Sequence, residues 1–203
     1  FRCISGEPNV VLNFIGSPEA EFSFYARPFH ESARLLTRRA FRRRRFRDLD
    51  ALPIVFLYRH ALELSLKAAV REGKRLIELY GHALPDEQLS QALNEHRLTA
   101  LLPYLQRAFK LAGWQWWLQE PGIATFEDVQ TILQDFERVD PSSYAFRYPT
   151  NKRGGGSVPR HFAFSLRHFV SMIDPLVEAF DTAAIALNAE YEQIAEALSE
   201  AQE

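Results

Sequence analysis

The sequence is poor in the residues that mark several classes of protein. Its 203 residues include one cysteine and one methionine, and no apolar run approaches the roughly 18 residues that cross a membrane. Cys3 has no partner for an internal disulfide, which suits a reducing, cytoplasmic setting. The spacing of Cys, His, Asp and Glu predicts no metal site, and no nucleotide-binding loop is present. We therefore expect no cofactor.

Charge of one sign is missing from long stretches of the chain, although the net charge is only -2. Between Arg27 and Arg47 there are nine arginines and one acidic residue, Glu31. After Arg167 there is no Lys or Arg, whereas eight acidic residues follow, beginning with Asp174. Such segregation indicates either a polyanionic partner or a match between the two oppositely charged segments.

Apolar periodicity predicts an all-α protein, an antiparallel helical bundle that forms a single domain over 18–203 after an irregular lead-in over 1–17. We expect Pro28 to interrupt or kink the first helix. The expected helices cover 17–28, 29–46, 50–73, 86–93, 97–111, 126–138 and 164–201. The helix over 50–73 is apolar around most of its circumference, which is typical of a central helix.

Local signals refine these helices. Asp50 is expected to cap the central helix, and Thr125 with Asp128 three residues later predicts a capping box. The long C-terminal helix is expected to bend at Pro175. Residues 140–159 contain three consecutive glycines and predict a long loop, a feature that is often functional or mobile.

Four polar side chains interrupt the apolar central helix: Arg59, His60, Glu63 and Lys67. At about 100° per residue, His60, Glu63 and Lys67 share one stripe. One interpretation is an acid–base or anion-binding cluster in which His60 has a shifted pKa. The other is a structural network whose charges satisfy one another at i,i+4, or a partly exposed surface stripe.

The glycine-rich loop interleaves aromatic and cationic side chains: Tyr144, Phe146, Arg147, Tyr148, Lys152 and Arg153. Bases stack on aromatic rings, and cations hold phosphates. The pattern thus predicts a nucleic-acid contact through Tyr148, Lys152 and Arg153. In the alternative interpretation, aromatic residues pin the loop to the core while Arg147 pairs with a buried carboxylate such as Glu63.

A block of arginines precedes the central helix: Arg38, Arg39, Arg42, Arg43, Arg44, Arg45 and Arg47. Helical spacing places Arg38, Arg42 and Arg45 on one face, where like charges oppose the helix unless anions lie nearby. Nucleic-acid phosphates are one source of anions, and Arg43 joins the three as a candidate contact. The acidic C-terminal helix is another source, in cis or from a second subunit.

Two segments together resemble the HEPN superfamily of small helical domains: FLYRHALELSLKAAV (56–70) and EHRLTALLPYL (95–105). A third segment, VDPSSYAFRYP (139–149), resembles one that occurs with this helix pair in uncharacterised bacterial proteins. The resemblance implies a bundle of four or more helices, frequent dimerisation, and RNA cleavage or binding in bacterial toxin–antitoxin and anti-phage systems. Catalytic members act without metal through an Arg followed, after four to six residues, by His. Only Arg75 and His82 match that spacing, in a variable connection instead of the last helix.

These observations support two hypotheses for function. The first is a HEPN-like, RNA-associated component of a bacterial defence or toxin system. If it cleaves RNA, as a metal-independent endoribonuclease, His60 or His82 would be the general acid–base, and Arg59, Lys67 and Arg147 would steady the phosphate. The second is a non-catalytic module that dimerises or binds a partner protein through its helices.

Overall fold

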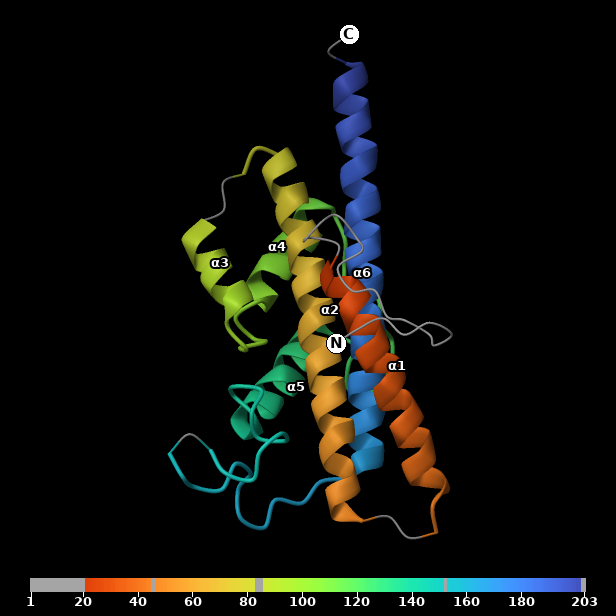
Figure 1. The fold of residues 1–203 in the computed structure, drawn as a ribbon. Coiled ribbons are helices and arrows are strands. Elements are labelled where there is room, and N and C mark those ends of the chain that lie inside the picture. Colours follow the sequence, from red (N-terminus) through yellow and green to blue (C-terminus); the bar gives the residue numbers. More distant parts are fainter. Residues whose placement is uncertain (1–20, 45–46, 83–85, 152, 202–203) are drawn as a thin grey trace, which may run out of the picture.

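The regular structure of the protein consists of helices, as the computed structural model shows for residues 21–44, 47–82, 86–151 and 153–201 (Figure 1). The helices are α1 (Glu21–Arg42), a short 3-10 turn (Asp48–Asp50), α2 (Ala51–Leu79), α3 (Asp86–Asn94), α4 (Leu102–Leu111), α5 (Phe126–Val139) and α6 (Leu166–Glu200). Within these ranges there is no strand, only one isolated bridge between Thr150 and Gly156. The predicted all-α class is confirmed, and the expected lead-in over 1–17 lies outside the described residues.

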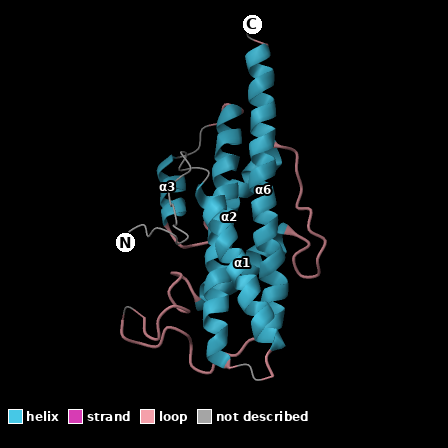
Figure 2. Ribbon diagram, turned by 45° about the vertical axis from the view of Figure 1, so that its right-hand side comes forward, coloured by secondary structure: helices cyan, strands magenta, loops and turns pink. Residues whose placement is uncertain are grey.

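Three long helices, α1, α2 and α6, pack along their lengths (Figures 1 and 2). Helix α1 runs antiparallel to both others. Against α6 this follows from the contacts, because later residues of α1 contact earlier residues of α6. His30 bonds Asp174, whereas Phe41 lies under Arg167. Helices α2 and α6 run parallel, since α3, α4 and α5 occupy the connection between them and carry the chain back (Figure 1).

Helix α2 is the central element, as its apolar sequence predicts. Ile54, Leu62, Leu66 and Leu76 are all buried against neighbouring helices, and full burial of one such side chain contributes about 1.5–3 kcal/mol. The expected end near Gly73 is wrong, because that glycine lies inside the helix.

Gly73 serves helix packing. A Cβ there would lie 2.7 Å from the Cβ of Ala108 on α4, so the missing side chain lets the two helices approach closely.

Of the two helix caps predicted from the sequence, one is present in the structure and the other is not. The capping box of α5 is confirmed: Thr125 Oγ1 accepts from the backbone N–H of Asp128, and the Asp128 carboxylate accepts from that of Thr125. Asp50 holds the N-cap position of α2 without capping it, because its carboxylate accepts from the backbone N–H of Arg47 and from Arg43 instead.

Neither proline inside a long helix ends it. Pro28 lies within α1, so of the two predicted outcomes, an interruption or a kink, the interruption does not occur. Helix α6 continues through Pro175, where a bend was predicted. A proline removes one backbone hydrogen bond, and the packing of α1 against α2 and α6 outweighs that loss here. No helix among the described residues is long and apolar enough to span a membrane.

Candidate functional site

Of the four polar residues singled out on the central helix, Arg59, Glu63 and Lys67 form one buried ion-pair network on α2. Arg59 Nη1 donates to Glu63 Oε2 at 3.0 Å, and Lys67 Nζ donates to Glu63 Oε1 at 2.8 Å. Arg59 is 0% exposed, Glu63 3% and Lys67 5%. Burial alone would raise the pKa of Glu63, but the two cations outweigh it and lower that pKa. In this arrangement the three side chains bind one another and are withdrawn from solvent.

Among the described residues that bond this buried ion-pair network, His96 alone is largely exposed to solvent, and sequence reasoning missed it. Its Nδ1 lies 2.9 Å from Glu63 Oε1, its carbonyl accepts from Arg59 Nη2, and its side chain is 51% exposed. The Glu63 carboxylate thus fixes one ring nitrogen of His96 and the orientation of its ring. The signal available in the sequence was Glu63 itself, whose oxygens can accept more bonds than two i,i+4 cations donate.

His60 belongs to the same helix but lies apart from the ion pairs. Its ring meets Phe29 edge-on at 4.4 Å and stacks on Phe56 at 5.9 Å. Burial lowers the pKa of His60 below its ordinary value, although the Glu63 carboxylate opposes the shift. The imidazole is therefore neutral near pH 7, which suits a packing role as well as proton acceptance.

Arg147 lies above an aromatic surface. Its guanidinium lies 5.5 Å from the ring centre of Phe56 and 5.9 Å from those of Tyr144 and Tyr148. The two tyrosines stack at 4.3 Å, and Tyr148 is 48% exposed. The expected alternative, a pair between Arg147 and Glu63, is not formed, since Glu63 meets Arg59, Lys67 and His96. Arg147 thus remains an exposed cation between aromatic rings.

The rest of the glycine-rich loop is held by its own polar side chains. The carboxylate of Asp140 accepts from the backbone N–H groups of Tyr144 and Ala145. Phe146 is buried, which confirms that it pins this loop to the core, whereas the same expectation for Tyr148 is wrong, because that side chain is exposed. Asn151 Oδ1 accepts from the N–H groups of Arg153 and Gly155, closing a turn around the glycines. Arg153 is exposed, and Lys152 lies outside the described residues.

The C-terminal end of α1 and the segment after it carry exposed arginines that lack an acidic partner. Among the residues that the structure describes, these include Arg38, Arg39, Arg42 and Arg44 on or next to α1. Arg43 pairs with Asp50 at 3.2 Å, and Arg45 is not among the described residues. We call the four unpaired arginines the basic end. Arg167 lies 4.4 Å over the Phe41 ring, so the start of α6 adds a cation to the same end of the bundle.

His82 lies far from the clusters of α2. It is exposed in the connection that follows α2, roughly 30 Å along the helix axis from His60 at 1.5 Å per residue. Its matched partner Arg75 faces α6, where it bonds Asn188 and Glu192. The structure thus does not join His82 to the side chains of Arg59, Glu63 or Lys67.

A second polar cluster, also absent from the sequence analysis, joins three helices at Asp174. Its carboxylate accepts from Arg34 at 2.6 and 2.7 Å, from Tyr58 at 2.9 Å, and lies 2.7 Å from His30 Nε2. Burial alone would raise the pKa of Asp174, but these bonds lower it. Burial and the Asp174 charge raise the pKa of Tyr58. The cluster fastens α1 and α2 to α6.

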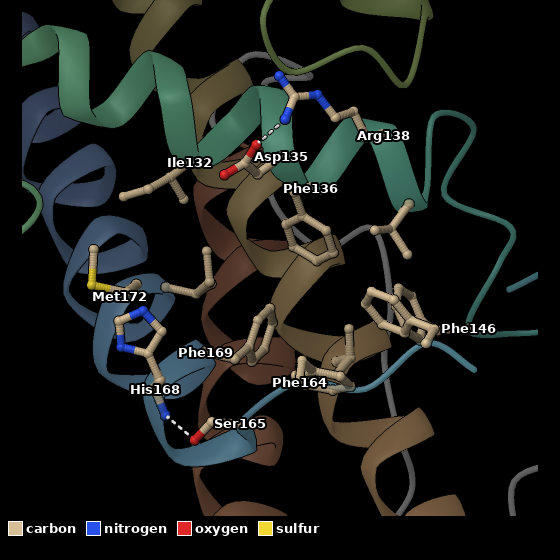
Figure 3. Close-up of a pocket in the computed structure, with 14 residues that line it drawn as sticks. Ile132, Asp135, Phe136, Arg138, Phe146, Phe164, Ser165, His168, Phe169 and Met172 are labelled. Atoms are coloured by element: carbon tan, nitrogen blue, oxygen red, sulfur yellow. Dashed lines mark hydrogen bonds and ion pairs between the residues drawn. The ribbon is translucent and has the colours of Figure 1, made fainter. Parts of the chain in front are cut away.

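A pocket of about 500 Å³ opens between α5, the start of α6 and the loop before it (Figure 3). Most of its lining is apolar and aromatic: Val55, Ile132, Phe136, Val139, Phe146, Phe162, Phe164, Phe169, Met172 and Ile173. Its polar residues are Asp135, which pairs with Arg138 at 2.6 Å, and Ser165 and His168. Volumes of about 300–1,000 Å³ are typical of small-molecule sites, so the pocket is large enough for a small ligand.

The described residues contain no group of three or more His, Cys, Asp or Glu side chains arranged to hold a metal ion. Comparison of the chain with family models, curated proteins and solved structures finds no match. The candidate site therefore has to be judged from its own geometry.

Proposed function

We propose that the protein is a HEPN-like helical domain that binds RNA in a bacterial defence or toxin system, and that it binds without cleaving. The observation that carries the proposal is the basic end, where four exposed arginines have no carboxylate partner among the residues that the structure describes. Phosphates of a nucleic-acid backbone supply the anions that such a surface needs.

Aromatic groups next to cations favour single-stranded over double-stranded RNA as the ligand. Arg147 and Tyr148 form an exposed stacking surface, and stacking of one base on an aromatic ring contributes about 1–3 kcal/mol. The pocket in Figure 3 adds further rings: Phe162 and Phe164 stack on each other at 5.4 Å and are 37% and 40% exposed. Bases in a duplex are already stacked and cannot use these rings.

Burial argues for binding instead of cleavage at the residues first considered catalytic. Arg59, Glu63 and Lys67 are enclosed and paired with one another. A group that stabilises a phosphate must approach it within hydrogen-bond distance. In the present arrangement these three side chains support α2 and hold His96 in place.

Binding of labelled single-stranded RNA tests the proposal. We expect affinity for an oligonucleotide of about 16 residues to fall steeply between about 50 and 200 mM salt. The double variant Arg38→Glu with Arg42→Glu should weaken binding and reduce the salt slope by about 2, because two phosphate contacts are lost.

The matched control reverses two exposed cations on α4, Arg107→Glu with Lys110→Glu, and should bind as the parent does. Equal loss in both variants would show an unspecific charge effect and refute the proposed surface. Degradation of the RNA by the pure protein, abolished by His96→Ala or His60→Ala, would contradict binding without cleavage.

A further inference from the structure

The three tryptophans of the chain lie together in the segment WQWW (114–117), directly after α4. The end of α4 fixes the first of them. Gly113 has a φ of 70°, its N–H donates to the carbonyl of Lys110, and the N–H of Trp114 donates to that of Phe109 at 2.8 Å. This pair of bonds is a Schellman motif, which folds the residue after the glycine back over the last turn. The rings of Trp114 and Phe109 accordingly meet at 5.9 Å.

Trp116 is held at both ends of its side chain. Its Nε1 donates to the carbonyl of Ile123 at 2.7 Å. Its ring meets Phe126 of α5 edge-on at 5.7 Å and Phe180 of α6 at 6.0 Å. Because the indole N–H already has an acceptor, the part of this ring that remains uncovered offers only carbon surface to a ligand.

A pocket of about 700 Å³ opens between α4 and the segment that carries these tryptophans, and we call it the tryptophan pocket. Four aromatic rings line it: Phe109, Trp114, Trp116 and Phe126. The contacts above fix these rings against three helices, so the pocket is already formed without a ligand. Its volume lies within the range of about 300–1,000 Å³ that is typical of small-molecule sites.

The polar lining of the tryptophan pocket is cationic and rich in hydrogen-bond donors. Arg107 and Lys110 lie three residues apart on α4, which places them on one side of the helix. Both are exposed, and neither makes an ion pair with a described residue. Gln106 and Gln115 add two amide groups, and no acidic residue lines the pocket in the described part of the chain. An anionic group is therefore the charge that complements this lining.

We propose that the tryptophan pocket binds an aromatic carboxylate, a small molecule whose carboxylate is attached to a flat ring. The ring packs against Trp114 and Trp116, and the carboxylate accepts hydrogen bonds from Arg107 and Lys110. Cations and rings share one pocket, so the charge and the ring of the ligand must also lie close together. A sugar separates these two groups in a nucleotide, which makes the ring carboxylate the closer match.

This inference does not rest on RNA binding, because the tryptophan pocket and the basic end are separate. Ala108 of α4 lies against Gly73 of α2, whereas Arg43 beside the basic end pairs with Asp50 at the start of α2. Residues 50 and 73 are separated by roughly 35 Å along the helix axis. A failure at one site therefore leaves the other untouched.

Calorimetric titration of the RNA-free protein with 2-naphthoate tests the proposal. We expect binding at one site, and a change in tryptophan emission when benzoate is added, since all three tryptophans lie at or beside the pocket. Arg107→Glu with Lys110→Glu should weaken the affinity about tenfold or more, because two charge-assisted bonds are lost. Trp114→Leu should weaken it about threefold or more through loss of ring contact.

Three analogues test the class of ligand. Uncharged 2-naphthamide should bind about tenfold more weakly, because its amide forms no charge-assisted bond. The saturated analogue decahydro-2-naphthoate should bind about threefold more weakly, since it lacks the flat ring. Adenosine monophosphate should bind more weakly than 2-naphthoate. Equal or tighter binding of any of the three overturns the assignment to aromatic carboxylates.

The matched controls change similar residues outside the pocket. Trp117→Leu removes the neighbouring tryptophan, and Arg97→Glu with Arg160→Glu reverses two exposed cations elsewhere. Both should bind 2-naphthoate like the parent, and equal loss in either overturns the location. The charge-reversed variant of α4 changes only exposed side chains, so it decides the outcome if Trp114→Leu fails to fold in a thermal unfolding check. Absence of binding by the parent at millimolar 2-naphthoate overturns the proposal outright.

Discussion

Arg59 and Arg38 are the same type of residue on adjacent long helices, yet their surroundings are opposite. Arg59 is fully buried, pairs with Glu63 and lies 5.7 Å from the ring centre of Phe136. Arg38 is exposed and has no acidic partner among the described residues. A charge in the interior must be paired because desolvation is costly, whereas water solvates an exposed charge and leaves it available to a ligand.

The largest expected effect on stability comes from removing a partner of the buried Arg59. Glu63→Ala leaves Arg59 and Lys67 enclosed without their carboxylate, and loss of one partner of a buried pair costs about 3–5 kcal/mol. We expect that decrease in the free energy of unfolding, measured with urea.

His96→Ala is the matched comparison, because it removes the half-exposed member of the same network. We expect it to cost about 1 kcal/mol, as for one ordinary hydrogen bond. A Glu63→Ala variant no less stable than His96→Ala would show that burial does not set the strength of this network.

An intermediate effect is expected at Asp174, which is half-buried. Asp174→Asn weakens charge-assisted bonds from Arg34, Tyr58 and His30, and we expect a loss of about 2–3 kcal/mol near pH 7. The lowered pKa of Asp174 means that the folded protein binds its proton less readily than the unfolded chain. This stabilisation is present above about pH 4 and is lost as pH falls toward the folded-state pKa.

Unfolding measured across acidic pH checks that sign. The stability difference between the parent and Asp174→Asn should shrink as pH falls below about 4. A difference that stays constant, or that grows with acid, would contradict the assignment of Asp174 as an ionised anchor.

The smallest effect on stability is expected from removing the exposed arginines of α1. Arg38→Ala with Arg42→Ala removes two unpaired cations, and surface changes of this kind stay within about 0.5 kcal/mol per site. Relief of like-charge repulsion at i,i+4 acts in the stabilising direction. Thermal unfolding of the double variant beside Glu63→Ala gives the comparison directly. A large loss of stability would mean that these arginines support the fold.

Local patterns predicted the elements that depend on neighbours in the sequence. The capping box at Thr125 and the apolar character of α2 follow from residues within one or two helical turns. The expected end of α2 at Gly73 failed for another reason. A glycine that ends a helix and one that admits another helix look alike in sequence, and only the position of Ala108 distinguishes them.

Only part of the candidate site could be predicted, because sequence patterns reveal contacts between near neighbours in the chain and not contacts between distant residues. Glu63 with Arg59 and Lys67 follows from i,i+4 spacing, but His96 is 33 residues from Glu63 and reaches it only through the fold. The Asp174 cluster draws side chains from three helices, with partners 116 to 144 residues away. No local period indicates such contacts.

The amino-acid sequence by itself determined the helical class, the central place of α2, and the segregation of arginines from glutamates, because these properties depend on short-range periodicity and composition. Only the tertiary structure decided which charges would be neutralised. Packing enclosed Arg59 and Lys67 around Glu63, joined Arg34 to Asp174, and placed the basic end and the acidic C-terminal end of α6 at opposite ends of the bundle. Whether a charge finds a partner depends on distance and burial in three dimensions, and neither is encoded in its local pattern.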